Sequence, residues 1–321
     1  MSVVKRIILI IASSIIIISV VVLMMINVAL PQIKYNDALE LMKQEKYDEA
    51  IDAFSAILAF RDSAQKIEDC KENQKEEVYL DARLAENLSR YENAFNLYTS
   101  LGNYKDSVKR KDSVRTKMQN ESIRNATRRS IVYFGSYEQD NNLENGKEPI
   151  KWYVINTNGS YLQLLAVNAL DAKPYHNEYK SITWEKCTLR VWLNNEFYNN
   201  TFNAAEQGLI VPWWNVSESR TGETKTVLDN VFLLNVNDVN RIYPTDYRKC
   251  IPTPYALAQG VYQSPDGEQC RWILRTPGEF MFNVQCVYFD GTFFQRGNDV
   301  NYQKDGLRPS IWINKGAVNY A

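Results

Sequence analysis

The sequence is poor in histidine and in glycine-rich motifs, and these shortages exclude several kinds of site. His176 is the only histidine among 321 residues, which excludes histidine-based catalytic triads and multi-histidine metal sites. It lies in a polar turn, where we expect a surface position. No Gly-x-Gly-x-x-Gly, phosphate-binding loop or Gly-x-Ser-x-Gly motif is present. We therefore expect no enzymatic activity, no cofactor and no metal.

Excess charge and a regular cysteine pattern are also missing. The chain has 37 basic and 38 acidic residues, and no run of Lys or Arg exceeds three, which argues against a nucleic-acid partner. The five cysteines are odd in number and irregularly spaced, so they form neither a zinc pattern nor a disulfide framework. We interpret most of them as small buried hydrophobic residues. A bridge between Cys270 and Cys286 on neighbouring strands stays open.

The one long hydrophobic run lies at the N-terminus. No charged residue occurs between Ile7 and Ile33, and a bilayer core needs about 20 apolar residues in a helix. A cleaved signal peptide has a shorter apolar core and a small-x-small site, whereas Asn27-Val28-Ala29 has a polar residue at one of the small positions. We expect residues 1–6 to be cytoplasmic and a retained transmembrane helix over residues 7–30, with membrane contact from Ile7 to Leu30.

The charges that flank this run predict its orientation. Lys5 and Arg6 precede the helix, while the lysines that follow it are mixed with acidic residues. A short basic N-terminus favours staying in the cytoplasm. We therefore expect a single-pass protein of the cell membrane with an extracellular C-terminal part.

A segment from 33 to 115 repeats itself at an offset of 44 residues. The matching positions include Tyr47 and Tyr91, Ala50 and Ala94, Phe54 and Tyr98, Ile57 and Leu101, Phe60 and Tyr104, and Asp62 and Asp106. Fixed-period similarity with apolar positions three or four apart predicts stacked helix-turn-helix units. The Tyr-x-x-Ala-x-x-x-Phe segment resembles tetratricopeptide repeats, which implies either a stalk or a protein-docking surface.

A change in composition divides the chain after the repeats. Residues 116–130 are polar and are interpreted as a linker, and all seven tryptophans follow it. The domain from 131 to 321 is predicted to be of the α+β class. Turn residues and strand formers predict strands at 131–137, 150–155, 161–167, 271–275, 284–289, 292–295 and 310–313. Helical spacing and caps predict short helices around residues 189–197, after Asn203, and at 254–258.

Several motifs of this domain carry a family resemblance. They are Thr183-Trp184, Leu189-Arg190-x-Trp192-Leu193-Asn194-x-x-Phe197-Tyr198, Val231 to Leu234, Thr253-x-Tyr255-Ala256, Trp272 to Gly278, and Leu307 to Trp312. In this order they resemble the bacterial family catalogued as domain of unknown function 6273, over about residues 131–315. The family is similar to domains with a C-type-lectin-like fold, which implies a scaffold that displays a ligand site. The Glu-Pro-Asn and Trp-Asn-Asp calcium triplets of animal lectins are missing.

Aromatic and amide residues between Gly278 and Tyr302 form the candidate binding face. Aromatic side chains offer contact area and amides offer directed hydrogen bonds. The expected ligand contacts are Phe280, Asn283, Gln285, Phe294, Arg296, Asn298 and Asn301. We expect Trp272, Leu274 and Trp312 in the core, and Arg275 and Arg308 to hold loops by hydrogen bonds.

Two functions remain open from the sequence. In the first, the protein is a membrane-anchored adhesion or recognition protein whose lectin-like domain binds a protein or glycan. In the second, the helical repeats bind a protein partner and the C-terminal domain is structural.

Overall fold

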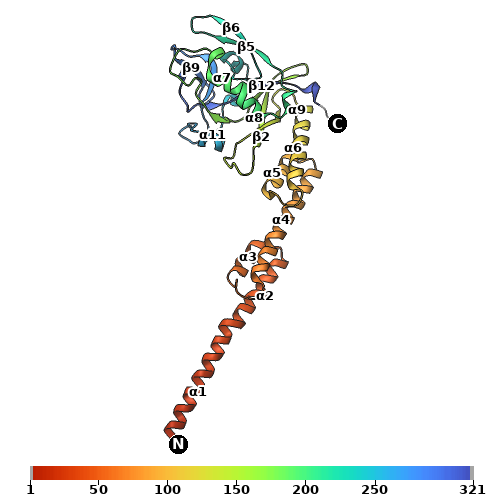
Figure 1. Ribbon diagram of the computed structural model, residues 1–321, viewed down its shortest axis with the longest axis vertical. Helices are drawn as coiled ribbons and strands as arrows, with labels where there is room; N and C mark the ends of the chain where they lie inside the picture. The colour runs from red at the N-terminus through yellow and green to blue at the C-terminus, as the bar shows by residue number, and fades with distance from the viewer. Residues whose placement is uncertain (1–2, 319–321) are drawn as a thin grey trace. The chain divides into compact units, whose positions relative to one another are not determined.

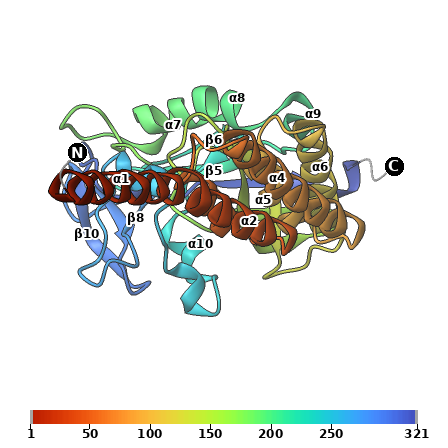
Figure 2. The same cartoon turned by 90° about the horizontal axis from the view of Figure 1, so that it is seen from below.

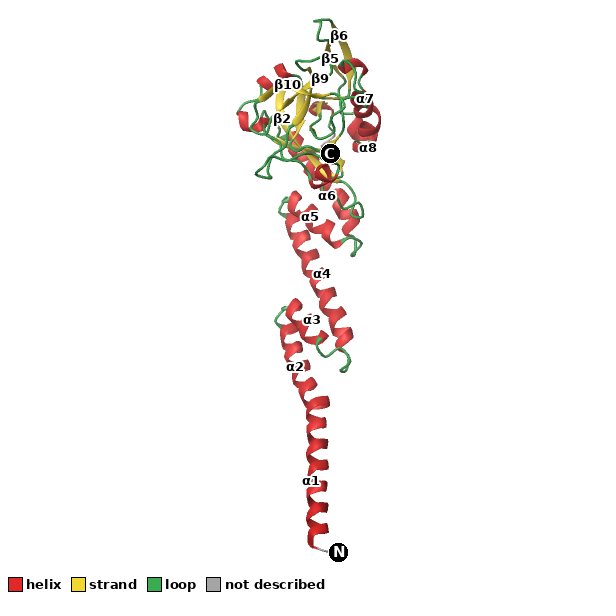
Figure 3. Ribbon diagram, turned by 90° about the vertical axis from the view of Figure 1, so that its left-hand side faces the viewer, coloured by secondary structure: helices red, strands yellow, loops and turns green. Residues whose placement is uncertain are grey.

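The computed structural model describes residues 3–318 (Figure 1), and the chain consists of two compact units, Met1–Lys111 and Asp112–Ala321. The first unit is helical, and all strands of the described residues lie in the second (Figure 3). The coarse expectation of an apolar N-terminal helix, a helical region and a mixed β-rich domain is therefore confirmed. Each unit is described by itself below.

The apolar run forms one long helix at the start of the first unit. Helix α1 (Val3–Met24) continues through the π-helical turn η1 (Met25–Ala29) into α2 (Leu30–Lys43). The π-helical turn lies where Pro31 would disturb a regular helix, because proline lacks an N–H and crowds the carbonyl four residues earlier, that of Asn27. Residues Ile7–Lys43 are long and apolar enough to cross a membrane, although a signal sequence has the same properties.

The predicted helix-turn-helix units are present. The first pairs α2 with α3 (Tyr47–Ser55), and the second pairs α4 (Ser63–Asn87) with α5 (Tyr91–Leu101), followed by α6 (Ser107–Arg124). The alanines at the matching positions, Ala50 and Ala94, are fully buried, as small residues at a close helix contact should be. The tetratricopeptide resemblance itself remains a hypothesis.

The 44-residue period extends to individual side-chain contacts. Tyr35 donates a hydrogen bond to Asp62 over 2.5 Å, and Tyr79 donates to Asp106 over 2.6 Å. The Tyr35 ring packs edge-on against Phe54 and Phe60, and the Tyr79 ring packs in the same way against the equivalent Tyr98 and Tyr104. Both units therefore share the same core arrangement. In each, a tyrosine packs against two aromatic rings and donates a hydrogen bond to the aspartate that precedes the next helix.

The prediction of a linker over residues 116–130 is wrong for most of that range. Helix α6 runs to Arg124, and Val114, Met118 and Ile123 within it are buried. Ile123 and Ala126 belong to the core of the second unit. The apolar positions are few and widely spaced among charged residues, which is why the segment looks like a linker in the sequence.

The second unit contains two five-stranded sheets and a two-stranded one. The first has the order β1 (Ile131–Tyr137), β2 (Glu148–Asn158), β3 (Tyr161–Ala166), β12 (Ser310–Asn314) and β7 (Val231–Phe232), all antiparallel. The second has the order β10 (Phe293–Asp299), β9 (Asn283–Val287), β8 (Trp272–Pro277), β11 (Gly306–Leu307) and β4 (Asp171–Ala172), and Figure 2 shows β8 and β10 from below. The hairpin of β5 (Trp213–Glu218) and β6 (Thr224–Asp229) was not predicted.

Short helices connect these strands. They are η2 (Trp184–Lys186), α7 (Thr188–Trp192), η3 (Leu193–Phe197), α8 (Tyr198–Thr201), α9 (Ala204–Gln207), α10 (Val236–Asn240), η4 (Thr245–Arg248), α11 (Pro254–Ala258) and η5 (Lys315–Ala317). The predicted capping box at Asn203 and Glu206 is confirmed, with both reciprocal hydrogen bonds present. Helix α11 begins with Pro254, as predicted.

The core of this unit holds most of the residues expected there. Trp272, Leu274 and Trp312 are buried, which confirms their assignment. His176 is buried instead of lying on the surface, because its turn packs against the start of α7 and its Nδ1 accepts a hydrogen bond from the backbone N–H of Thr188. Burial lowers the pKa of this imidazole, which disfavours its charged form.

The cysteines are buried and unbridged. All five lie within the described residues and are free thiols, so the Cys270–Cys286 bridge that the sequence left open is not formed. The strand register explains this, since Cys286 of β9 faces Ile273 of β8 while Cys270 lies before that strand begins. The interpretation of the cysteines as small buried residues is confirmed.

Candidate functional site

A polar pocket of about 610 Å³ opens at one end of the second sheet. The residues that line it come from β5, the start of α10, the end of β8, the following loop, β9 and β10: Glu218, Asn235, Val236, Asn237, Thr276, Gly278, Glu279, Gln285 and Gln295. Seven of these nine residues carry a polar side chain, which makes the pocket a candidate for binding a polar ligand.

Irregular strand pairing shapes the wall formed by β9 and β10. Their register shifts between Phe294 and Asn298, and the β8–β9 register shifts between Ile273 and Pro277. At the first shift Gly297 has φ +74°, and a Cβ there would lie 2.2 Å from the carbonyl oxygen of Val284. Only glycine fits this position. Bulges of this kind bend a strand and redirect its side chains, here those of Gln285 and Gln295.

A capped helix start forms the opposite wall. Asn235 and Asp238 exchange reciprocal hydrogen bonds at the start of α10, and Thr276 accepts a hydrogen bond from the N–H of Val236 over 3.0 Å. Arg275 forms an ion pair with Asp238 at 3.1 Å and donates a hydrogen bond to the carbonyl of Leu233. These bonds fix α10 against β8, and they support the predicted role of Arg275 in holding a loop.

The loop after β8 forms the rim. Arg220 donates a hydrogen bond to the carbonyl of Gly278 over 2.8 Å. The Phe280 side chain is 50% exposed, and the Arg296 guanidinium lies 5.4 Å from the centre of its ring. An exposed aromatic ring therefore stands in the loop that contributes Gly278 and Glu279 to the pocket, supported by a cation–π contact.

The seven predicted contact residues do not form one surface. Gln285 lines the pocket, and its Nε2 donates to the carbonyl of Pro277 over 3.0 Å. Phe280 and Arg296 pair at the rim, as described above. The side chains of these three residues lie at or next to the pocket, and the backbone carbonyl of Asn283 accepts a hydrogen bond from the N–H of Gly278 in the lining over 2.8 Å.

The other four predicted contacts have other surroundings. Asn283 donates to Asp299 over 3.0 Å, and Asn298 donates to the buried Asp305 over 2.6 Å, so both amides already have protein partners. The half-buried Phe294 packs near Tyr288, with ring centres 6.0 Å apart. Asn301 is exposed.

The pocket residues that sequence reasoning missed are of two kinds, since Thr276, Glu279 and Gln295 lie in or beside this segment while others lie far from it in the chain. Glu218, Asn235 and Asn237 precede it by more than 40 residues, and the fold brings them to the same place. The Asn-x-x-Asp spacing of Asn235 and Asp238 was an available signal for a helix start. Nothing in the sequence linked that helix start to β9.

The pocket lining offers mainly hydrogen-bonding groups. Among the described residues that line it, the only ionisable side chains are Glu218 and Glu279, and the others offer amides and a hydroxyl. Amide groups both donate and accept hydrogen bonds. The two carboxylates are the charged groups of the lining, while the guanidiniums of Arg220 and Arg296 at the rim contact the Gly278 carbonyl and the Phe280 ring.

Comparison with known proteins finds one family to which this part of the chain is similar. No curated protein and no solved structure gives a significant match to it. The resemblance expected for residues 131–315 is confirmed over a shorter range that still contains the whole pocket. A family model described as Domain of unknown function (DUF6273) matches residues 158–315, and this segment is similar to that family.

Proposed function

We propose that the protein is a membrane-anchored recognition protein that presents its C-terminal unit outside the cell and binds an uncharged, hydroxyl-rich ligand, a glycan, in the polar pocket. The lining of amide, hydroxyl and carboxylate side chains around about 610 Å³ carries this proposal. Sugar hydroxyls both donate and accept hydrogen bonds, which amide side chains match. A C-type-lectin-like scaffold is part of the same proposal.

The rim adds the second kind of contact that a sugar needs. The exposed ring of Phe280 offers an apolar face next to the pocket, and the C–H groups of a pyranose can pack on such a face. The carboxylates of Glu218 and Glu279 favour neutral glycans over acidic ones. This combination favours a neutral cell-surface or cell-wall glycan over a protein ligand.

Helical continuity supports a retained anchor over a cleaved signal. The apolar segment runs without a break into α2, whose Tyr35 and Ala38 are buried in the core of the first repeat. None of the residues in the most hydrophobic stretch of this helix is buried. A bilayer would cover that surface.

Direct binding of glycans by the full chain in detergent tests the proposal. We expect neutral glycans to bind and Gln295→Ala or Gln285→Ala to weaken binding at least tenfold, about 1.4 kcal/mol. Gln303→Ala is the matched control, because Gln303 is an exposed glutamine outside the pocket lining. Equal affinity in the pocket variants and the control would refute the pocket as the site.

A specific observation favours the alternative in which the repeats bind a protein. Leu80, Leu84 and Leu88 are each more than 50% exposed and recur every four residues along α4 and at its C-terminal cap. At the equivalent positions of the first repeat the residues are Asn36, Glu40 and Gln44, so the fold of the repeat does not require leucine there. Loss of a protein partner in Leu84→Gln, with glycan binding unchanged, would support this second function.

A further inference from the structure

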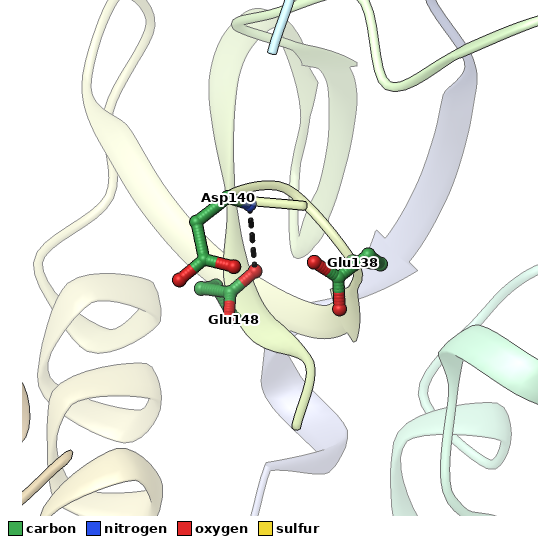
Figure 4. A group of neighbouring side chains, drawn as sticks. All are labelled: Glu138, Asp140 and Glu148. Carbon is green, nitrogen blue, oxygen red and sulfur yellow. Dashed lines mark hydrogen bonds between the residues drawn. The ribbon is translucent and has the colours of Figure 1, made fainter. Parts of the chain in front are cut away.

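Three carboxylates meet in the loop that joins β1 to β2. Glu138 follows β1, Asp140 lies in the loop, and Glu148 begins β2. Their carboxylate oxygens lie within 4.8 Å of one another. Figure 4 shows the Glu138 carboxyl turned toward those of Asp140 and Glu148. The cluster lies outside the pocket and plays no part in the proposed recognition function.

The protein itself satisfies some of these oxygens. Glu148 accepts hydrogen bonds from the backbone N–H groups of Gln139 and Asp140, over 2.7 and 3.4 Å. Asp140 accepts from the N–H of Asn142 over 2.8 Å and from the Asn145 amide over 2.7 Å. These bonds hold the carboxylates in place, but they do not neutralise three like charges.

Two buried oxygens in this loop have no partner among the described residues. The Glu138 side chain is 8% exposed, and its Oε1 accepts no hydrogen bond. The Oδ1 atom of Asn145 is also buried without a donor, while the amide nitrogen of the same group is bonded to Asp140. A buried carboxylate oxygen without a donor is costly, unless a cation or another donor satisfies it.

The three carboxylates increase the demand for a cation. Like charges whose oxygens lie within 4.8 Å of one another repel. A cation bound between them would offset this repulsion.

We propose that Glu138, Asp140 and Glu148 form a calcium-binding site. All three residues offer hard oxygens, the type that Ca²⁺ and Mg²⁺ prefer over nitrogen and sulfur. Ca²⁺ binds oxygens at about 2.3–2.6 Å, so oxygens on opposite sides of one ion are at most about 5 Å apart, and the cluster satisfies this limit. Ca²⁺ accepts irregular loop geometry, whereas Mg²⁺ demands a near-ideal octahedron.

Thermal unfolding of the chelator-treated full chain in detergent tests this site. All seven tryptophans lie in the second unit, so their fluorescence follows the unit that contains the cluster. We expect Ca²⁺ to raise the melting temperature with a dissociation constant of roughly 10⁻⁴–10⁻³ M, the range of extracellular modules. Mg²⁺ should act only at much higher concentration.

Two variants and a control separate binding from mere structural support. Glu138→Gln should weaken calcium binding by about tenfold or more while raising the melting temperature without calcium, because one of three repelling charges is gone. Asp140→Asn should likewise weaken calcium binding, and it serves if the first variant does not fold. Glu144→Gln, an exposed glutamate of the same loop outside the cluster, should bind calcium like the unchanged chain.

The opposite results would overturn the site. Titration calorimetry that shows no calcium uptake, or equal uptake by Glu138→Gln, Asp140→Asn and the unchanged chain, would contradict it. Equal affinity for Mg²⁺ and Ca²⁺ would contradict the choice of calcium. Each of these outcomes is distinguishable from failure of the glycan pocket, because the readout is ion binding and not glycan binding.

Discussion

At the residue scale, Arg308 shows how the core of the C-terminal unit accommodates a charge. Its side chain is fully buried, donates hydrogen bonds to the carbonyls of Ala166 and Arg248 over 2.7 and 3.3 Å, and lies 4.9 Å from the ring centre of Trp272. Trp272 in turn donates to the same Arg248 carbonyl over 2.8 Å. The Arg308 guanidinium and the Trp272 indole therefore both bind the Arg248 carbonyl and hold its loop in place, and they also contact each other.

Truncating this tryptophan should be costly. Trp272→Ala removes a fully buried side chain from beside Arg308, and we expect a loss of about 3–5 kcal/mol in the free energy of unfolding. Phe280→Ala, at a half-exposed ring, should change it by no more than about 0.5 kcal/mol. Urea unfolding followed by the remaining tryptophans measures both. Equal effects would contradict the assignment of one residue to the core and the other to the rim.

The thiols give a second prediction at this scale. Burial raises the pKa of Cys187 to about 12, and it also raises the pKa of Cys286, so both stay protonated at neutral pH. All five thiols are buried, so alkylating reagents should label none of them in the folded chain. After denaturation without reductant, mass spectrometry should find five labels, whereas three would indicate one disulfide bridge.

At the element scale, Glu206 contributes more than a helix cap. It completes the capping box of α9 and also accepts hydrogen bonds from the N–H of Gly135 over 3.2 Å and from Arg115 of α6 over 3.1 Å. Its side chain is only 2% exposed. One carboxylate therefore joins α9, β1 and the middle of α6.

Substitutions at this cap should separate its two roles. Asn203→Ala removes one capping bond and should cost about 1 kcal/mol. Glu206→Ala also leaves the Gly135 N–H and Arg115 without their partner, so we expect a loss of about 3–5 kcal/mol. Denaturant unfolding of the two variants measures this difference. Similar losses would show that Glu206 acts only as a cap.

At the scale of the whole molecule, the membrane orientation can be tested on intact cells. The short basic N-terminus favours a cytoplasmic position, so added protease should remove the C-terminal unit and leave an N-terminally tagged fragment in the membrane. Cells opened before digestion serve as the control for the protease sites themselves. Full protection in intact cells would reverse the orientation, and loss of the tag without protease would indicate a cleaved signal.

Local patterns in the sequence determined much of the architecture. The length of the run without charged residues predicted the apolar helix, and the 44-residue period predicted the helical repeat. Turn residues between strand formers predicted the β2–β3 hairpin. The capping box at Asn203 was predicted from four consecutive residues. These features were predictable because each depends on interactions between residues close in the chain or on exact repetition of them.

Only the tertiary structure decided what distant segments build together. It placed Asn235 of the α10 cap and Gln285 of β9 in one pocket, and it buried Val114, Met118 and Ile123 of α6, whose apolar residues are too sparse to indicate a core helix. It also brought Glu138 and Glu148, ten positions apart, into one carboxylate cluster across a loop. Such sites depend on strand register and loop closure, which long-range packing sets and which no local pattern of residues encodes.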